Sequence, residues 1–326
     1  MFMMRFDLRV PDGGAPARAR YLAALDMAAW AETRGCISVV LSEHHMVDDG
    51  YLPSPLVMAA AVAARTTSVP ITIAALLLPL YEPVRLAEEM AVLDVLSGGR
   101  VLFVAALGYR PDEYAMHGVE YRRRGRIADE KLALLLRAKT GEPFEHEGRR
   151  IHVTPRPLTP GGPMVAWGGG SIPAARRAGR SGIGFFAQRG EPALRDAYET
   201  AAREAGHEPG LCILPSADDP STVFVAEDLD RAWDELGPHL MHDVRSYGAW
   251  NEGTEGTASI SFAKTAEELR RENRSHRILT VDEAVAFVRS GRPLPLHPLI
   301  GGIPPDVAWP YLRTVAERVL PAAQGG

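Results

Sequence analysis

Two adjacent histidines directly follow an apolar run in the first part of the chain. Residues 37–41 are Ile-Ser-Val-Val-Leu, and Ser42, Glu43, His44 and His45 come next. An imidazole titrates near neutral pH, so it can transfer a proton or hydrogen-bond a cofactor. Neighbouring side chains on an extended chain point to opposite sides, so the two rings cannot easily ligate one metal ion. We therefore expect a histidine that works in proton transfer or cofactor binding. The alternative is a polar strand end whose side chains only pack.

Three glycines and a serine separate a second apolar run from a helical segment. Gly168, Gly169, Gly170 and Ser171 follow the run at residues 163–167. Glycines let the backbone approach a ligand closely, and Ser171 can cap the helix that follows. Free N–H groups and the dipole at a helix N-terminus favour an anion such as phosphate. The pattern predicts a phosphate site; the alternative is a flexible turn with an ordinary serine cap.

Two further groups of residues carry weaker signals. His239, His242 and Asp243 have the one-turn spacing of a helical metal pair, but no third ligand follows at a definite spacing, so we expect no metal site. Gly108 and Tyr109 follow another apolar run. An aromatic ring at that place can stack on a planar ligand or simply cover the fold.

Short apolar runs alternate with longer segments of helical period along the whole chain. The expected strands begin near residues 4, 37, 71, 101, 163, 183, 222 and 297, and a helical segment follows each of them. Parallel strands need right-handed crossovers, and eight such units close naturally into a (β/α)8 TIM barrel. The sequence therefore predicts an α/β fold with the candidate residues at the carboxyl ends of the strands, where barrel enzymes keep their active sites.

Surplus length concentrates in two insertions, at residues 108–126 after the fourth strand and at residues 237–280 after the seventh. We predict a single domain over residues 1–326, because no repeat or clear linker divides the chain. A doubly wound open sheet is the rival architecture, but no glycine-rich dinucleotide fingerprint follows the first strand.

Composition excludes several classes of protein. The chain has 326 residues, 46% of them hydrophobic and 24% charged, which is typical of a globular protein. A net charge of −5 offers no basic surface for nucleic acid. Two cysteines, Cys36 and Cys212, are too few for a disulfide framework and fit a reducing cytoplasm. Charged residues interrupt the N-terminus, and no apolar window is long enough for a membrane span. We expect a cytoplasmic protein without nucleic-acid or membrane partners.

Several motifs match a known family in their order and spacing. They are Glu43-His44-His45, Ala74-Ala75 within IAALLLPLYEPVRLAEEMAVLD, Ser97-Gly98-Gly99-Arg100, the segment GYRPDEYAMHGVEYRRRGR, Trp167 with the glycine-serine turn, and the closing IGGIPPDVAW. Together they resemble the bacterial luciferase-like, flavin-dependent monooxygenase family. The similarity is strongest from residue 37 to residue 190 and thinner between residues 237 and 295.

The resemblance implies a TIM barrel that binds FMN, or its deazaflavin relative coenzyme F420, at the carboxyl ends of the strands. It implies that His44 is catalytic, and we expect Glu43 to orient it. It also implies a non-proline cis peptide at Ala74-Ala75 beneath the flavin ring, where small side chains avoid a collision with the ring.

The remaining cofactor contacts implied by the resemblance come from the strand ends. The glycine-serine turn at residues 168–171 matches the family's flavin phosphate site, and we expect Gly108 and Tyr109 to contact the cofactor too. Leu107 stands where the luciferase arginine contacts the flavin phosphate, and Ala106 where luciferase has a reactive cysteine. FMN and F420 therefore both stay open, and light emission is not expected.

The interpretation that we favour is a monooxygenase using reduced FMN and O2 on a small organic substrate. A separate flavin reductase would supply the reduced flavin, and the chain would be a homodimer, as is common in the family. Residues 249–262 would form a mobile lid over the site; the alternative is a long surface loop. The alternatives are an F420-dependent dehydrogenase or reductase, a non-catalytic flavin-binding protein, and a metal-dependent hydrolase using Glu43 and the histidines.

Overall fold

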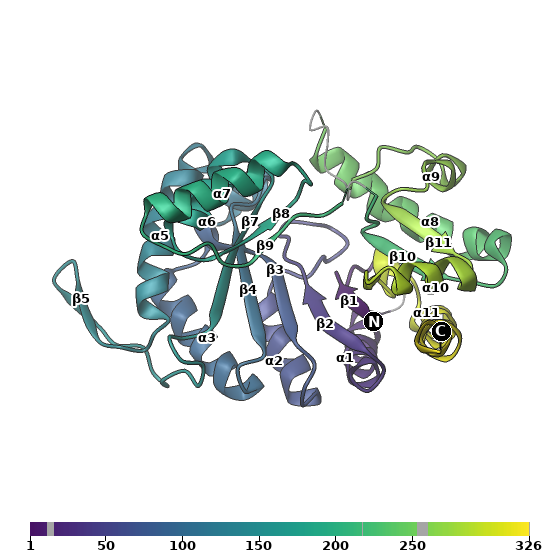
Figure 1. The fold of residues 1–326 in the computed structure, drawn as a ribbon, viewed down its shortest axis with the longest axis horizontal. Helices are drawn as coiled ribbons and strands as arrows, with labels where there is room; N and C mark the ends of the chain where they lie inside the picture. The colour runs from purple at the N-terminus through teal and green to yellow at the C-terminus, as the bar shows by residue number, and fades with distance from the viewer. Residues whose placement is uncertain (12–15, 217, 253–259, 326) are drawn as a thin grey trace. The chain divides into compact units, whose positions relative to one another are not determined.

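Parallel strands joined by helices form the framework of the protein, which confirms the predicted α/β class (Figure 1). The computed structural model describes residues 1–11, 16–216, 218–252 and 260–325. The chain falls into two units. Unit 1 comprises Met1–Val40, Val47–Leu52 and Ser216–Gly326, and unit 2 comprises Leu41–Met46 and Pro53–Pro215. A single domain over residues 1–326 stays a prediction.

Unit 2 contains five neighbouring parallel strands, in the order β3, β4, β7, β8 and β9. Their bounds are β3 Ile71–Leu77, β4 Val101–Ala106, β7 Met164–Gly169, β8 Gly184–Ala187 and β9 Cys212–Ile213. The helices are α2 Pro55–Arg65, η1 Leu78–Leu80, α3 Pro83–Ser97, α4 Pro111–Met116, η2 Tyr121–Arg123, α5 Arg124–Ala138, α6 Ile172–Arg180 and α7 Pro192–Glu204. An antiparallel hairpin, β5 Phe144–His146 with β6 Arg149–Ile151, extends away from the rest of this unit (Figure 1).

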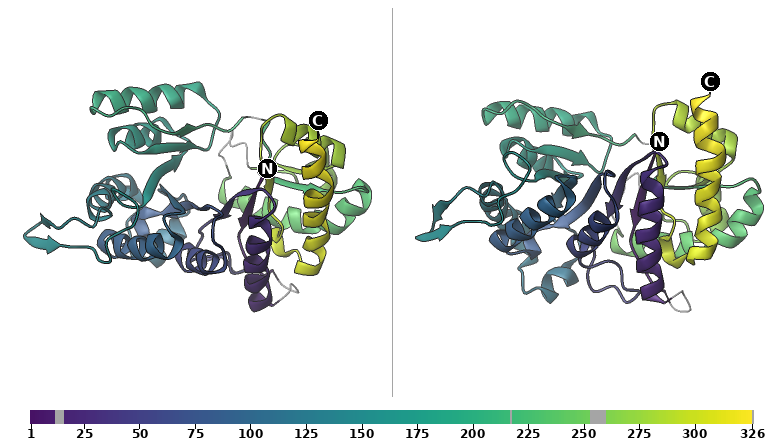
Figure 2. Two further views of the ribbon diagram at one scale, coloured as in Figure 1. Left: turned by 60° about the horizontal axis from the view of Figure 1, so that its bottom comes forward. Right: turned by 90° about the horizontal axis from the view of Figure 1, so that it is seen from below.

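Unit 1 contains the other strands, in the order β11, β10, β12, β1 and β2. Their bounds are β1 Phe2–Phe6, β2 Cys36–Leu41, β10 Thr222–Val225, β11 His276–Leu279 and β12 Leu294–Leu296. The helices are α1 Ala17–Glu32, α8 Leu229–Trp250, α9 Ala266–Glu272, α10 Val281–Arg289, η3 Ile300–Gly302, α11 Pro305–Thr314, η4 Val315–Val319 and α12 Leu320–Gln324. Helix α1 lies beside α11, where Trp30 and Trp309 meet edge to face with ring centroids 5.5 Å apart (Figure 2).

Two details of the predicted strands are wrong. The run at residues 297–300 is not a strand, because β12 ends at Leu296 and the chain then turns, with the Ile300 N–H donating to the His297 carbonyl. Leu299 and Ile300 are apolar because they fill the core of unit 1. The insertion predicted at residues 237–280 contains a further parallel strand, β11, which pairs with β10. At four residues, with two of them basic, β11 carries too little hydrophobic pattern to be found from the sequence.

The insertion after the fourth strand is confirmed, since α4 and η2 lie within residues 108–126. In the described part of the chain, no helix is both long and apolar enough to cross a membrane.

One arginine secures the amino ends of the strands in unit 2. Arg100, directly before β4, donates from its guanidinium to the carbonyls of Ala63, Thr66, Val69 and Ser97 and to the Thr66 hydroxyl, over 2.6–3.2 Å. Ala63 and Thr66 lie at the C-terminal end of α2, where helical carbonyls have no partner within the helix. The planar fork of an arginine can satisfy several such acceptors at once.

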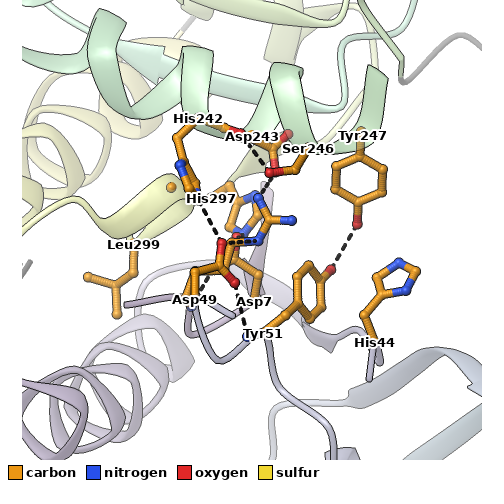
Figure 3. A network of polar contacts seen from close by, with 12 residues as sticks. Asp7, His44, Asp49, Tyr51, His242, Asp243, Ser246, Tyr247, His297 and Leu299 are labelled. Atoms are coloured by element: carbon orange, nitrogen blue, oxygen red, sulfur yellow. Dashed lines mark hydrogen bonds and ion pairs between the residues drawn. The ribbon is translucent and has the colours of Figure 1, made fainter. Parts of the chain in front are cut away.

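Charged side chains are buried inside unit 1, after β1 and β12. Asp7 and Arg9 are fully buried, and His297 is nearly so. His297 Nε2 and Arg9 Nε lie 3.6 Å and 3.8 Å from Asp7 Oδ2. Figure 3 shows side chains of α8 and of the segments after β1 and β12 pointing toward one another. These charged side chains pair with one another within unit 1.

The residues of α8 that have metal-pair spacing bind three different partners. His239 Nδ1 donates to the Gly301 carbonyl, and His242 Nε2 donates to Asp49 over 2.6 Å. Asp243 accepts from His276 Nε2 over 3.0 Å and lies 3.5 Å from the Arg9 guanidinium. These three side chains therefore do not converge on a common point.

Protonation of Asp7 and His297 couples the stability of unit 1 to pH in opposite directions. Burial raises the pKa of Asp7 to about 6, against the opposing charge of Arg9. Between 3.8 and that value the folded chain holds a proton that the unfolded chain has lost, so unfolding free energy falls as pH rises. Burial, with Arg5, lowers the pKa of His297 well below 6.5, so unfolding free energy falls as pH falls below 6.5. Below about pH 6 the two effects offset each other.

We expect Arg100→Ala to lower the free energy of unfolding by about 2–4 kcal/mol, because it leaves several carbonyls of the α2–β3 connection without a donor. Urea denaturation measures the change. Arg150→Ala, at an exposed position of the β5–β6 hairpin, is the control and should change stability little. Equal losses in the two variants would show that the Arg100 contacts do not stabilise the fold.

Asp7→Asn removes the carboxyl group that takes up a proton in the folded chain. The loss of unfolding free energy that His297 causes on acidification is then no longer offset. We expect the unfolding free energy of this variant to fall on acidification below pH 6 by about 1.4 kcal/mol per pH unit more than that of the parent protein. Urea denaturation between pH 7 and pH 5 measures both slopes, and adding His297→Gln should restore the parent slope. Parallel slopes for the parent and Asp7→Asn would contradict the offset.

Candidate active site

The two histidines after β2 take different partners, as expected of neighbours on extended chain. His44 is 6% exposed and His45 8% exposed. His44 Nδ1 lies 2.8 Å from Glu113 Oε1, whereas His45 Nε2 lies 2.8 Å from Glu43 Oε1. Because a carboxylate accepts at Nδ1, the His44 proton sits on that nitrogen, and Nε2 is the acceptor for the Tyr109 hydroxyl at 3.3 Å.

Glu113, in the first turn of α4, fixes His44. Its side chain is fully buried, and Oε1 also accepts from the His45 backbone N–H at 3.0 Å and lies 3.4 Å from the Arg110 guanidinium. Burial raises the pKa of Glu113, but the hydrogen bond from His44 and the positive charge that this ring carries when protonated, together with the His45 N–H and Arg110, outweigh burial and hold this pKa below its usual value. The carboxylate therefore stays ionised beside the imidazole and fixes its tautomer and direction.

Glu43 bonds to His45 and to the end of β3, whereas His44 Nδ1 bonds to Glu113, so the expected orientation of His44 by Glu43 stays a prediction. Glu43 Oε1 accepts from His45 and from the Tyr81 hydroxyl at 2.9 Å, and its Oε2 accepts from the Leu77 backbone N–H at 2.9 Å. Sequence reasoning missed Glu113 because it lies 69 residues after His44, on an inserted helix whose packing no local pattern specifies. The only available signal is its place in the insertion after the fourth strand.

Small residues line the ends of β3 and β4 next to these side chains. The peptide between Ala74 and Ala75 is cis, as the family resemblance implies. The pairing of β3 with β4 shifts register between Ala74 and Leu76, so the strand bulges there. Gly108 has a φ of +74°, and a Cβ on it would lie 3.2 Å from the Leu77 side chain, so glycine is required for the turn that presents Tyr109 to His44.

The glycine-serine turn lies at the carboxyl end of β7. Gly168 and Gly169 end the strand, and Ser171 Oγ accepts from the Ala174 N–H at 3.4 Å, so the predicted helix cap is present. A Cβ on Gly168 would lie 3.1 Å from Val104 of β4 and 3.7 Å from the Ala106 Cβ, which places the turn against the end of β4. Its role in phosphate binding stays a prediction.

All of the predicted site residues belong to unit 2. Direct contacts join His44 to Tyr109 and Glu43 to the end of β3, and Gly168 packs against β4. Arg189, which sequence reasoning did not single out, lies near Gly170 in the turn after β8, because a Cβ on Gly170 would be 3.5 Å from Arg189 Cγ. Of the predicted lid at residues 249–262, residues 253–259 lie outside the described residues.

The chemistry of this site suits a ligand with a flat apolar ring and an anionic tail. It offers small side chains at the ends of β3 and β4, one buried imidazole with a fixed tautomer, and a capped helix N-terminus. Within the described ranges, no three His, Cys, Asp or Glu side chains are grouped as a metal site requires.

Solved structures with a similar fold cover almost the whole chain. The crystal structure of the monooxygenase RslO1 from Streptomyces bottropensis has a TM-score of 0.75 and 22% identity, over 98% of this chain and 99% of that one. The FMN complex of the oxygenating constituent of 3,6-diketocamphane monooxygenase from Pseudomonas putida has a TM-score of 0.67 and 20% identity, over 98% of each chain. These likenesses show the fold, the parallel α/β architecture of the luciferase-like TIM-barrel enzymes.

Curated relatives match shorter stretches. The chain spans about half the length of the first of them: alignments with two Sinorhizobium fredii proteins, each 31% identical, cover 51% and 44% of those proteins and 54% and 47% of this chain. An F420-dependent glucose-6-phosphate dehydrogenase of Kineococcus radiotolerans is 33% identical over 205 residues, which are 56% of this chain and 59% of the dehydrogenase.

The sequence profile of the family described as luciferase-like monooxygenase matches residues 2–290. This match covers most of the 326 residues and includes every residue of the candidate site. The chain therefore belongs to the luciferase-like monooxygenase family, whose members include FMN-dependent monooxygenases and F420-dependent dehydrogenases.

Proposed function

We propose that this protein is a monooxygenase that uses reduced FMN and O2 to oxidise a small organic substrate. The main support for this proposal is the geometry of His44. The side chain is a buried imidazole with Nδ1 tied to an ionised carboxylate, so that Nε2 faces Tyr109 as the one nitrogen able to take up a proton. A proton acceptor held in this way suits general acid–base chemistry at a bound cofactor or substrate.

The residues that would hold the flavin come from three strand ends. The ring would lie over Ala74 and Ala75, whose side chains leave its face clear, and Gly108 and Tyr109 would border it. The phosphate would bind the N–H groups at the start of α6, with the Ser171 hydroxyl beside it. Gly168, Gly169 and Gly170 would let the backbone approach the phosphate closely.

Reduced flavin supplies the electrons that activate O2, and the protein binds, orients and shields it. His44 Nε2 would move a proton at the reacting atoms, while Glu113 stabilises the imidazole when it carries that proton. Tyr109 would donate to Nε2 in the resting state and give way as the substrate binds. A separate flavin reductase would deliver reduced FMN, and the chain would act as a homodimer.

An F420-dependent dehydrogenase is the second candidate. Leu107 replaces the arginine that grips the flavin phosphate in luciferase, and the relative from Kineococcus radiotolerans is named as F420-dependent. In that case His44 would move a proton at the substrate hydroxyl or carbonyl, with no role for O2.

Cofactor titration separates the two candidates. We expect FMN to bind with a dissociation constant in the micromolar range or below, seen as quenching of flavin fluorescence, and F420 to bind at least about tenfold more weakly. Stopped-flow mixing should then show that protein-bound reduced FMN reacts with O2 faster than free reduced FMN. Preferential binding of F420 would favour the dehydrogenase, and an O2 reaction no faster than in free solution would favour a protein that only stores flavin.

His44→Ala should lower turnover by about 10²–10⁴-fold while FMN affinity stays within about threefold, because the imidazole moves a proton and does not grip the cofactor. Glu113→Gln should shift the pH profile of turnover to lower pH, since an amide stabilises a protonated imidazole less than a carboxylate does. Turnover is measured on the best substrate from a screen of small ketones and aldehydes. The exposed His152→Ala is the control, and a His44→Ala variant as active as this control would remove His44 from the mechanism.

A further inference from the structure

The connection between β3 and α3 is held from two sides by polar side chains. We call residues 77–81 the β3 loop; it begins two residues after Ala75 and contains η1. Glu43 bonds both of its ends, through the Leu77 N–H and the Tyr81 hydroxyl, each at 2.9 Å. From the other side, Lys131 Nζ in α5 donates to the carbonyls of Pro79 and Tyr81, each at 2.6 Å. Four hydrogen bonds therefore hold the five-residue β3 loop in place.

The groups that form these hydrogen bonds are buried or half-buried, and burial strengthens hydrogen bonds that involve a charged group. Glu43 is 2% exposed, and its carboxylate oxygens accept hydrogen bonds from His45 and from both ends of the β3 loop. Burial and the neighbouring Glu43 carboxylate raise the pKa of Tyr81, so the phenol keeps its proton and donates. Hydrogen bonds that involve a charged group in such surroundings are about twice as strong as neutral ones.

The β3 loop directly follows the bulge at Ala74 and Ala75, so its position affects the path of that part of the strand. The bulge at Ala74 and Ala75 ends where Leu76 resumes pairing with β4, one residue before the N–H that Glu43 accepts. A bulged strand has fewer ladder hydrogen bonds to define its path, so the contacts that follow it must do so. Leu77 also packs against the turn at Gly108.

We propose that Glu43 and Lys131 are positioning residues, which set the β3 loop and through it the surface on which the cofactor ring rests. This inference builds on the proposed function, and it assigns Glu43 to the cofactor floor instead of to His44. Neither side chain needs to touch the cofactor. A ring that must lie flat on two alanines loses contact when the strand end shifts by a fraction of an ångström, so the loop contacts determine affinity.

The same helix offers a matched control. Lys139, which follows α5, donates from Nζ to the Gly161 carbonyl over 2.6 Å, in a loop that precedes β7 at its amino end. Burial lowers the pKa of both lysines, so both ammonium groups are partly desolvated. Lys131→Met and Lys139→Met therefore remove the same charge at opposite ends of the strands, with two hydrogen bonds to backbone carbonyls lost in the first and one in the second.

The experiment compares FMN affinity and backbone protection in the full chain. We expect Lys131→Met to raise the dissociation constant of oxidised FMN about tenfold, and Lys139→Met to leave it within about twofold. In the ligand-free protein, hydrogen–deuterium exchange of the peptide over residues 74–81 should rise in Lys131→Met and not in Lys139→Met. Lys131→Arg, which keeps a cation at this position, should recover most of the affinity.

The results of these measurements either support or overturn the positioning role of Glu43 and Lys131. Equal FMN affinities for the two methionine variants, or unchanged exchange over residues 74–81 in Lys131→Met, would overturn it. Glu43→Gln provides a second route, because loss of the charge should weaken FMN binding even if the lysine variant folds poorly. Failure of the parent protein to bind either FMN or F420 would overturn the proposed function itself, and the inference with it.

Discussion

The hydrogen bond between His44 and Glu113 is the interaction on which the site depends. A buried carboxylate is costly unless hydrogen bonds and opposite charge compensate it, and Glu113 obtains both from the segment at residues 44–45 and from Arg110. The bond settles which nitrogen of His44 carries the proton, and therefore which nitrogen can accept one. It also ties the inserted helix α4 to the segment at residues 44–45 within unit 2. A single contact thus joins the chemistry of the histidine to the placement of the insertion.

Buried titratable and charged side chains have different kinds of contacts in the two units. In unit 2 the imidazole of His44 has one nitrogen committed to Glu113 and another in a longer contact with the half-buried Tyr109, which a ligand can replace. In unit 1 the guanidinium of Arg9 lies among carboxylates and over the rings of Tyr51, Tyr247 and Trp250, at 4.8–5.6 Å. That cluster is held by ion pairs and ring contacts within unit 1, and its titration makes the stability of this unit depend on pH.

The features that the sequence predicts are those encoded locally. Apolar runs such as Ile71–Leu77 identify the strands, and Ser171 caps its helix through a local hydrogen bond to a backbone N–H of the first turn. Family resemblance adds the alanine pair and His44. Glu113 and Lys131 could not be predicted, because their partners lie 69 and about 50 residues away and are set by the packing of α4 and α5. The strand β11 was missed for a related reason, since its four residues become a strand only through pairing with β10.

The two ends of the strands in unit 2 are built for different tasks. At the amino ends, Arg100 directs its donors to backbone carbonyls, and Asp94 accepts from both the N–H and the hydroxyl of Thr159. Such bonds between side chains and backbone fix the path of the chain and leave little free capacity. At the carboxyl ends, side chains also bond to one another, as Glu43 does with His45 and Tyr81 while it accepts from the Leu77 N–H. Side-chain pairs can rearrange when a ligand arrives, whereas a side chain fastened to the backbone cannot move without unfolding its loop. Lys131 donates to two backbone carbonyls at the carboxyl ends, which is the property expected of a residue that holds the floor of a binding site still while the groups around it react.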